Sequence, residues 1–278
     1  MKTRLGDWLG GAVFVVLAAV TLAFLVLPIV GIFVHTTPGK LFVELSDPAV
    51  RDAFVVTLKT SVAAQALIIV FGTPTAYLLA TRRFRGHAVA VTLVELPLVL
   101  PPVVAGIGLL VTLGRVGLLG SRVPFFSIAF TQAAVVVAVA YVASPLYIRQ
   151  AIAAFEVVDP RLPAASRTLG AGSVRTFFRV MLPLARGGLI AGLALSFARG
   201  LGEFGATIMF AGSLQGVTRT LPLAIYYELD VNQDAALAMG GVLILVSALL
   251  LLTLRIALSW QRSPSNASPS LFGLSSSR

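Results

Sequence analysis

The chain has 278 residues and a formal net charge of +10, with 21 Lys and Arg against 11 Asp and Glu. That charge is typical of nucleic-acid-binding proteins, but 58% of the residues are hydrophobic, only 12% are charged and the mean hydropathy is +0.96. So little polar surface excludes a soluble globule, a disordered chain and a nucleic-acid binder. The composition therefore indicates an integral membrane protein. The absence of cysteine excludes disulfides and thiolate metal sites.

Six segments are long and apolar enough to cross a membrane as helices, namely residues 9–34, 54–80, 89–113, 127–148, 184–212 and 235–259. The first is too long for the apolar part of a signal peptide, and we interpret it as a retained helix. We expect an all-α membrane protein in which residues 1–53 form the first helix and an external loop. Residues 54–260 would form the core, and the Ser/Pro-rich residues 261–278 a disordered cytoplasmic tail.

The basic residues predict how the chain is oriented. If the N-terminus is cytoplasmic, fourteen Lys and Arg fall in inside segments and five in outside segments. Positive residues concentrate on the cytoplasmic side of membrane proteins. We therefore expect both termini in the cytoplasm, which agrees with an even number of spans.

A long inside segment, about residues 149–186, is predicted to hold structure of its own between the fourth and fifth spans. Leu162, Ala165 and Leu169 have helical spacing, Pro163 suits the first helical residue, and Gly170 is a typical stop. This pattern predicts a short amphipathic helix outside the bilayer. Whether that helix binds a partner or only links two spans stays open at this point.

The fifth span carries small residues at helical spacing and two charges. Gly188, Gly192, Ser196 and Gly200 share a face with Glu203, and Arg199 is four residues before Glu203. Small residues allow close helix approach, so this face either meets another helix at an interface, lines a passage, or serves packing within the chain. The charges either line a polar pathway or form a structural ion pair near the outer end.

Prolines interrupt several spans. The third contains Pro97, Pro101 and Pro102, and Pro74 and Pro145 mark further irregularities. Broken helices favour a passage that opens and closes, because the freed carbonyls need protein or water as partners. Glu95 and Lys59 are less informative, since both can lie near interfaces. No pattern indicates a catalytic residue or a metal site.

At residues 164–183 the inside loop resembles the signature of permease subunits of ATP-binding-cassette importers. The family motif is Glu-Ala-Ala, three residues, Gly, nine residues and Ile-x-Leu-Pro. Here it reads Ala164-Ala165-Ser166, then Gly170, then Val180-Met181-Leu182-Pro183, with Ala164 for the family Glu and Ser166 for its second Ala. The spacing matches throughout. The resemblance implies a type I importer permease fold whose loop helix is a coupling helix that docks on an ATPase.

A narrower resemblance, over about residues 95–245, is to the molybdate branch of the molybdate/sulfate/tungstate permeases. It is carried by residues 96–104, by 197–207 and by the segment Thr-Leu-Pro-Leu-Ala-Ile-Tyr at 220–226. It implies a homodimer, two cytoplasmic ATPase subunits that bind ATP and Mg, and an external oxyanion-binding protein. This chain itself would hold no cofactor and would not be an enzyme.

We therefore expect the permease subunit of an ATP-driven molybdate importer in the cytoplasmic membrane. Rivals are a sulfate or tungstate importer, a secondary transporter with its own coupling-ion site, and a non-transporting membrane scaffold. The docking residues would be Ala164, Ala165, Ser166, Leu169, Gly170 and Pro183. The pathway or gate residues would be Pro101, Pro102, Arg199 and Glu203.

Overall fold

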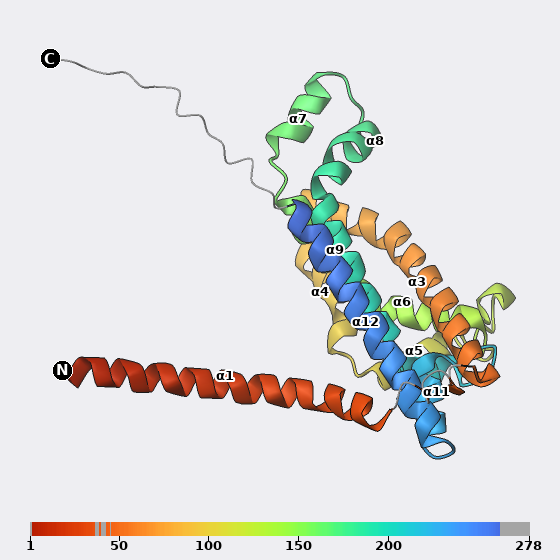
Figure 1. Cartoon of the computed structure of the whole chain (residues 1–278). Coiled ribbons are helices and arrows are strands. Elements are labelled where there is room, and N and C mark those ends of the chain that lie inside the picture. The colour runs from red at the N-terminus through yellow and green to blue at the C-terminus, as the bar shows by residue number, and fades with distance from the viewer. Residues whose placement is uncertain (1, 37–38, 40–42, 45, 262–278) are drawn as a thin grey trace.

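The computed structural model describes residues 2–261 apart from residues 37–38, 40–42 and 45 (Figure 1). Over these residues the chain is helical and contains no strand, which confirms the all-α prediction. The predicted disordered tail lies outside the described residues, except for Gln261 at the end of the last helix.

The long helices are α1 (Lys2–His35), α3 (Pro48–Thr81), α6 (Gln132–Glu156), α9 (Leu182–Leu201) and α12 (Gln233–Gln261). The shorter ones are α4 (His87–Val99), α5 (Pro102–Leu113), α7 (Arg161–Thr168), α8 (Ser173–Thr176), α10 (Gly205–Ala211) and α11 (Leu221–Glu228). A 3₁₀ turn covers Pro124–Phe126, and a π-helical turn covers Phe177–Met181.

Five segments of the described chain are long and apolar enough to cross a membrane: Ala12–His35, Pro48–Thr81, Gln132–Glu156, Ser173–Leu201 and Gln233–Thr253. A sixth span is counted if α4 and α5 are taken together, although the two helices are bent by 113°. The structure thus supports five or six spans where the sequence predicts six.

The predicted interruption of the third span, residues 89–113, is confirmed, because the chain breaks at Leu100 and Pro101. Both residues are extended, with ψ near 130°. A residue that precedes proline is disfavoured in the α conformation, and here two prolines follow one another. The break therefore follows from the sequence Leu100-Pro101-Pro102, and α5 restarts with Pro102 in its first turn, where a missing N–H costs nothing.

The predicted bounds of the fifth span, residues 184–212, are wrong at both ends. The helix α9 stops at Leu201, and α10 begins only at Gly205. At the inner end the helical path starts earlier, at Ser173. Pro183 cannot donate a hydrogen bond to the carbonyl of Arg179, and the turn before it widens, so that the Leu182 N–H donates to Phe177 instead.

Two other prolines do not break their helices, contrary to the prediction of irregularities there. Both α3, through Pro74, and α6, through Pro145, continue without interruption. The start of α3 is fixed by Asp47, whose carboxylate accepts the Ala49 N–H at 2.7 Å. Thr131 caps α6 in the same way by accepting the Ala134 N–H at 3.3 Å.

The helix α6 is the centre of the bundle. It packs against α3, α9, α10, α4 and α5, while α12 packs against α9, α11 and α1. In Figure 1, α1 extends away from the bundle, and α7 and α8 project beyond the ends of the long helices. The apolar side chains of α1 between residues 13 and 27 are exposed, so lipid or further protein must cover them.

Candidate functional site

The amphipathic loop helix is present as α7, but it begins two residues before the predicted Pro163. The Arg161 N–H donates to the Asp159 carboxylate at 2.8 Å, which fixes the entry into the helix. Pro163 lies in the first turn, where backbone N–H groups have no partner within the helix. Leu169, predicted inside the helix, is its C-terminal capping residue.

Gly170 ends α7 as predicted, and the geometry gives the reason. Its φ of 82° lies in the left-handed region that favours glycine. The Gly170 N–H donates to the Arg167 carbonyl at 3.0 Å, and the Ala171 N–H donates to the Ser166 carbonyl at 3.1 Å. These two bonds form a Schellman motif, which satisfies the last carbonyls of the helix.

The predicted docking residues of α7 lie on two different hollows. One, of about 560 Å³, is lined by Leu162, Ala165, Ser166, Leu169, Ala171, Arg179, Val180, Pro183 and Leu184. Ala164 faces the other, of about 610 Å³, with Arg83, Glu156, Pro163 and Arg167. Leu169 is 88% exposed, so an apolar side chain stands free at the tip of the loop. A single exposed apolar side chain is common on protein surfaces, so the docking role of Leu169 stays a prediction.

A hydroxyl pair connects α7 to the helical path that follows it. Ser166 Oγ lies 3.2 Å from Oγ1 of Thr176, which is buried. From Ser173 the chain is helical without a break through the π turn to Leu201. The loop helix is thus attached to one end of a long rod, and the rod ends beside Arg199 and Glu203.

An aromatic cluster fixes this rod to the bundle at the π turn, a feature that the sequence prediction missed. The ring of Phe177 lies 4.9 Å from that of Tyr77 on α3 and 6.2 Å from that of Phe155 on α6. The Tyr77–Phe177 pair is edge-to-face, an arrangement that stabilises a contact beyond the area it buries. The sequence feature nearest to the π turn is Pro183, two residues after its end.

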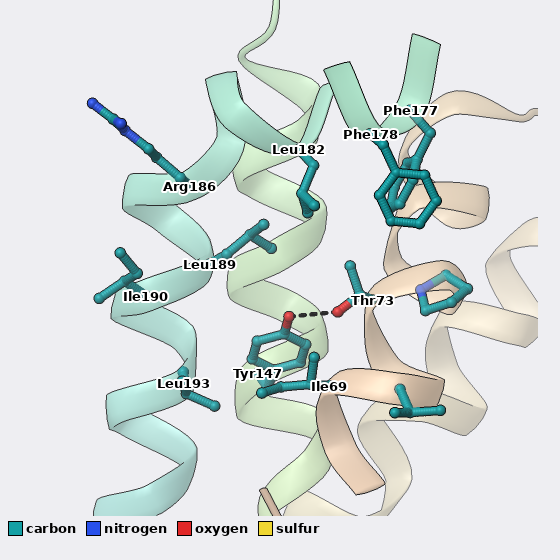
Figure 2. A pocket seen from close by; sticks show the side chains of 12 residues that line it. Ile69, Thr73, Tyr147, Phe177, Phe178, Leu182, Arg186, Leu189, Ile190 and Leu193 are labelled. Carbon is teal, nitrogen blue, oxygen red and sulfur yellow. Dashed lines mark hydrogen bonds between the residues drawn. The ribbon is translucent and has the colours of Figure 1, made fainter. Parts of the chain in front are cut away.

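Beside this cluster lies a largely apolar cleft of about 560 Å³ between α3, α6 and α9 (Figure 2). At its floor the Thr73 and Tyr147 hydroxyls lie 2.6 Å apart. Leu182, Leu189 and Leu193 line the α9 side, and Arg186 points away at the rim. The two hydroxyls satisfy each other, so the cleft offers an apolar surface.

At the other end of the rod, Arg199 and Glu203 form the predicted ion pair, with Nη1 and Oε2 2.8 Å apart. Glu203 lies beyond α9, not on its face as expected, and its second oxygen accepts the Ala206 N–H at 2.8 Å. Its side chain is 1% exposed. The geometry favours the structural interpretation, in which Glu203 caps α10 and neutralises Arg199.

Pro102 and Glu203, predicted as pathway residues and distant in sequence, belong to neighbouring segments. A Cβ placed on Gly205 would lie 2.9 Å from Pro102 Cβ, and one on Gly106 would lie 2.7 Å from the Ala206 carbonyl oxygen. The helices α5 and α10 therefore pack closely through these two glycines. Pro101, in contrast, is exposed at the bend.

The small-residue face of α9 serves packing within the chain. A Cβ on Gly188 would meet Ala154, one on Gly192 would meet Gln150, and one on Gly200 would lie 2.8 Å from Val139 Cγ1. All three neighbours belong to α6. The alternatives of an interface between copies or a passage along these glycines are therefore wrong.

The helix α6 continues beyond the predicted fourth span, residues 127–148, and includes Arg149. The Nε of Arg149 is 3.1 Å from Oε1 of Glu95 on α4. Among the described residues no group of three or more His, Asp and Glu side chains is placed to hold a metal ion.

A family model for the inner membrane component of binding-protein-dependent transport systems matches residues 68–260. This chain belongs to that family. It is a multi-pass component of the inner membrane, as the five or six spans also indicate. The match includes the loop helix, the rod and the α5–α10 contact.

The relatives carry consistent names. The chain is 40% identical over 233 residues to "Molybdenum transport system permease protein ModB" of Mycobacterium tuberculosis, covering 83% of this chain and 88% of that protein. It is 46% identical over 185 residues to the protein of the same name from Escherichia coli K12, covering 66% and 80%. Together these matches place the chain in the molybdate branch of the importer permeases.

Solved structures confirm the fold. A chain of a bacterial alginate transporter, in complex with its pentasaccharide-bound periplasmic protein, matches with a TM-score of 0.69 at 17% identity, covering 94% of this chain and 96% of that one. The inward-facing MetNI methionine transporter matches with a TM-score of 0.57 at 19% identity, covering 75% and 94%. The chain therefore has the fold of the importer permeases, as predicted.

Proposed function

We propose that two copies of this chain form the passage of an ATP-driven importer that takes up molybdate delivered by an external binding protein. The observation that carries the proposal is the connection between an exposed loop helix, α7, and the helical rod that ends at the α5–α10 contact. The substrate, molybdate, is inferred from the names of the two relatives, which are 40% and 46% identical to this chain. Both termini would lie in the cytoplasm, in agreement with fourteen basic residues inside against five outside.

The loop helix is suited to transmit force. The Schellman motif at Gly170 and the Ser166–Thr176 contact hold α7 in one arrangement relative to α8. The aromatic cluster at Phe177 couples the start of the rod to α3 and α6. An ATPase subunit that binds α7 and moves would therefore displace the rod and its packed neighbours as one rigid body. Rigid-body movement of this kind is a common way in which proteins switch between states.

The chemistry of the loop defines what its partner needs. Leu169 presents an apolar side chain, Arg179 lines the same hollow, and Arg161, Arg167 and Arg175 are exposed elsewhere on the loop segment. The partner would offer an apolar cleft with acidic groups at its rim. ATP and Mg would be bound and hydrolysed there, since this chain has no phosphate-binding loop, and the chain itself would only convert the motion into transport.

The proposal is tested by reconstituting the purified permease with its ATPase and binding protein in proteoliposomes and measuring uptake of labelled molybdate. ATP-dependent uptake that excess unlabelled molybdate suppresses, and sulfate does not, would support it. Preferred suppression by tungstate or sulfate would favour those substrates instead. Uptake driven by an ion gradient without the ATPase would refute it in favour of a secondary transporter, and no uptake at all would favour a scaffold.

The docking step has its own matched pair of variants. Leu169→Asp places a charge at the loop tip and should abolish co-purification of the ATPase. Val157→Asp is the control, because Val157 is 86% exposed, close to the 88% of Leu169, but precedes α7 and lines neither hollow. Unchanged co-purification with Leu169→Asp, or equal loss with both variants, would contradict docking at α7.

A further inference from the structure

Arg149 and Glu95 form an ion pair on an exposed face of the bundle. Their side chains are 60% and 38% exposed, although both lie in helices of the membrane region. Arg149 is about two turns before the end of α6, and Glu95 about two turns after the start of α4. The pair therefore lies toward the inner ends of two candidate membrane spans, α6 and the bent pair α4–α5.

Charged groups within membrane-spanning segments face protein or a water-filled cavity. The helix α4 has no buried residue, so one side of it contacts α6 and the rest is uncovered in the single chain. The pair therefore marks a side of α4 and α6 that is polar in the assembled protein. An ionic site of this kind inside a membrane is by default a candidate for a substrate pathway.

The position of Arg149 along α6 identifies the part of the pathway. On the outer side, the residues of the same helical face, Val142 and Pro145, are buried. Val142 belongs to the core cluster that includes Ala105 of α5 and Ala206 of α10. On the inner side, Ala153 and Glu156 of this face are exposed. Arg149 thus lies where the buried outer half of the face gives way to an exposed inner half.

The chemistry of the pair fits a tetrahedral oxyanion. A guanidinium presents five N–H donors in a planar fork that matches paired oxygens. Conduction requires sites that bind weakly enough to release their ion. A carboxylate 3.1 Å from the guanidinium competes with the anion and neutralises Arg149 when no anion is present.

We propose that Arg149 is a transient oxyanion-binding residue on the inner side of the α5–α10 contact, and that Glu95 limits how long the anion stays there. The inference deepens the proposed function and rests on it. The anion displaces Glu95 from the guanidinium as it moves inward and then leaves along the exposed inner half of the face. No covalent step is involved.

Uptake by the reconstituted complex tests the role of Arg149. Arg149→Gln and the charge swap Glu95→Arg/Arg149→Glu should each reduce molybdate uptake at least tenfold, with dimer assembly and ATP hydrolysis within twofold of wild type. Lys59→Gln is the control, because Lys59 is an exposed cation in the span α3, and it should retain uptake within twofold. Recovery of uptake by the charge swap, or loss of the dimer in Arg149→Gln, would overturn the proposal in favour of a structural pair.

A binding measurement on the permease alone covers the case in which Arg149→Gln does not assemble. Glu95→Gln frees the guanidinium, so the purified variant should bind labelled molybdate at least tenfold more tightly than wild type. Glu95→Gln/Arg149→Gln should lose that gain, and equal affinity in all three proteins would overturn the inference. Absence of ATP-driven uptake by the wild-type complex, in contrast, would refute the proposed function itself.

Discussion

Arg199 and Glu203 join the last turn of α9 to the first turn of α10 through a contact of 2.8 Å between Nη1 and Oε2. The carboxylate is buried and also accepts the Ala206 N–H, whereas the guanidinium is partly exposed. The two partners therefore differ in what their loss would leave behind. Without Arg199 a buried carboxylate stays uncompensated, which is the more costly outcome.

Arg199→Ala should lower the free energy of unfolding of the permease by about 3 kcal/mol, because it leaves the buried Glu203 carboxylate without its cationic partner. Arg199→Ala/Glu203→Gln should recover most of that loss, since the remaining amide oxygen still accepts the Ala206 N–H without a charge. Thermal unfolding in detergent and the level of folded protein measure both effects. A double variant as unstable as Arg199→Ala would contradict the structural role, as would normal stability of Arg199→Ala with impaired transport.

The contact between α5 and α10 depends on Gly106, and Gly108 on the same helix provides a control. A methyl group on Gly106 would lie 2.7 Å from the Ala206 carbonyl oxygen and 2.8 Å from Met209 Cβ. A methyl group on Gly108 would have no atom of a neighbouring described segment within 4 Å. Gly106→Ala should therefore destabilise the protein by about 1–3 kcal/mol. Gly108→Ala should be neutral. Thermal unfolding of both variants measures the difference, and equal midpoints would show that the two helices do not pack this closely.

The sequence predicts the spans well and their ends poorly, for a physical reason. Hydropathy reports which residues avoid water, and it is equally high on both sides of the break at Leu100. The break comes from backbone geometry before two prolines, whereas Pro74 and Pro145 stand in helices that continue through them. A proline shows where a hydrogen bond is missing, but the surrounding packing decides whether the helix bends there.

Some features of the candidate site depend on local sequence and could be predicted, whereas others depend on contacts between distant segments and could not. The stop at Gly170 follows from the sequence, because the backbone conformation of one residue decides it. The Ser166–Thr176 contact, the aromatic cluster around Phe177 and the Arg149–Glu95 pair each join segments that the helices bring together. Such contacts have no signature at a fixed spacing, so a single sequence does not reveal them.

The hydroxyl pair of Thr73 and Tyr147 should stabilise the α3–α6 contact by a modest amount. Both side chains are buried and their oxygens lie 2.6 Å apart. Hydrogen bonds between membrane helices contribute about 0.6 kcal/mol on average and reach roughly 1.7. A double-mutant cycle with Thr73→Val and Tyr147→Phe, read by unfolding in mixed micelles, should give a coupling energy in this range. A coupling of zero would mean that the two hydroxyls find other partners when separated.

The loop helix offers the sharpest test of how local backbone geometry supports docking. Gly170 has a φ of 82°, which costs a residue with a Cβ about 1–2 kcal/mol. Gly170→Ala should loosen the end of α7, seen as faster amide hydrogen exchange at positions 170 and 171 and as weaker co-purification of the ATPase. Gly170→Asn is the matched control, because asparagine tolerates the left-handed conformation and should lose less of both. Equal effects of the two substitutions would indicate that the side chain at this position, rather than the backbone conformation, disturbs the partner.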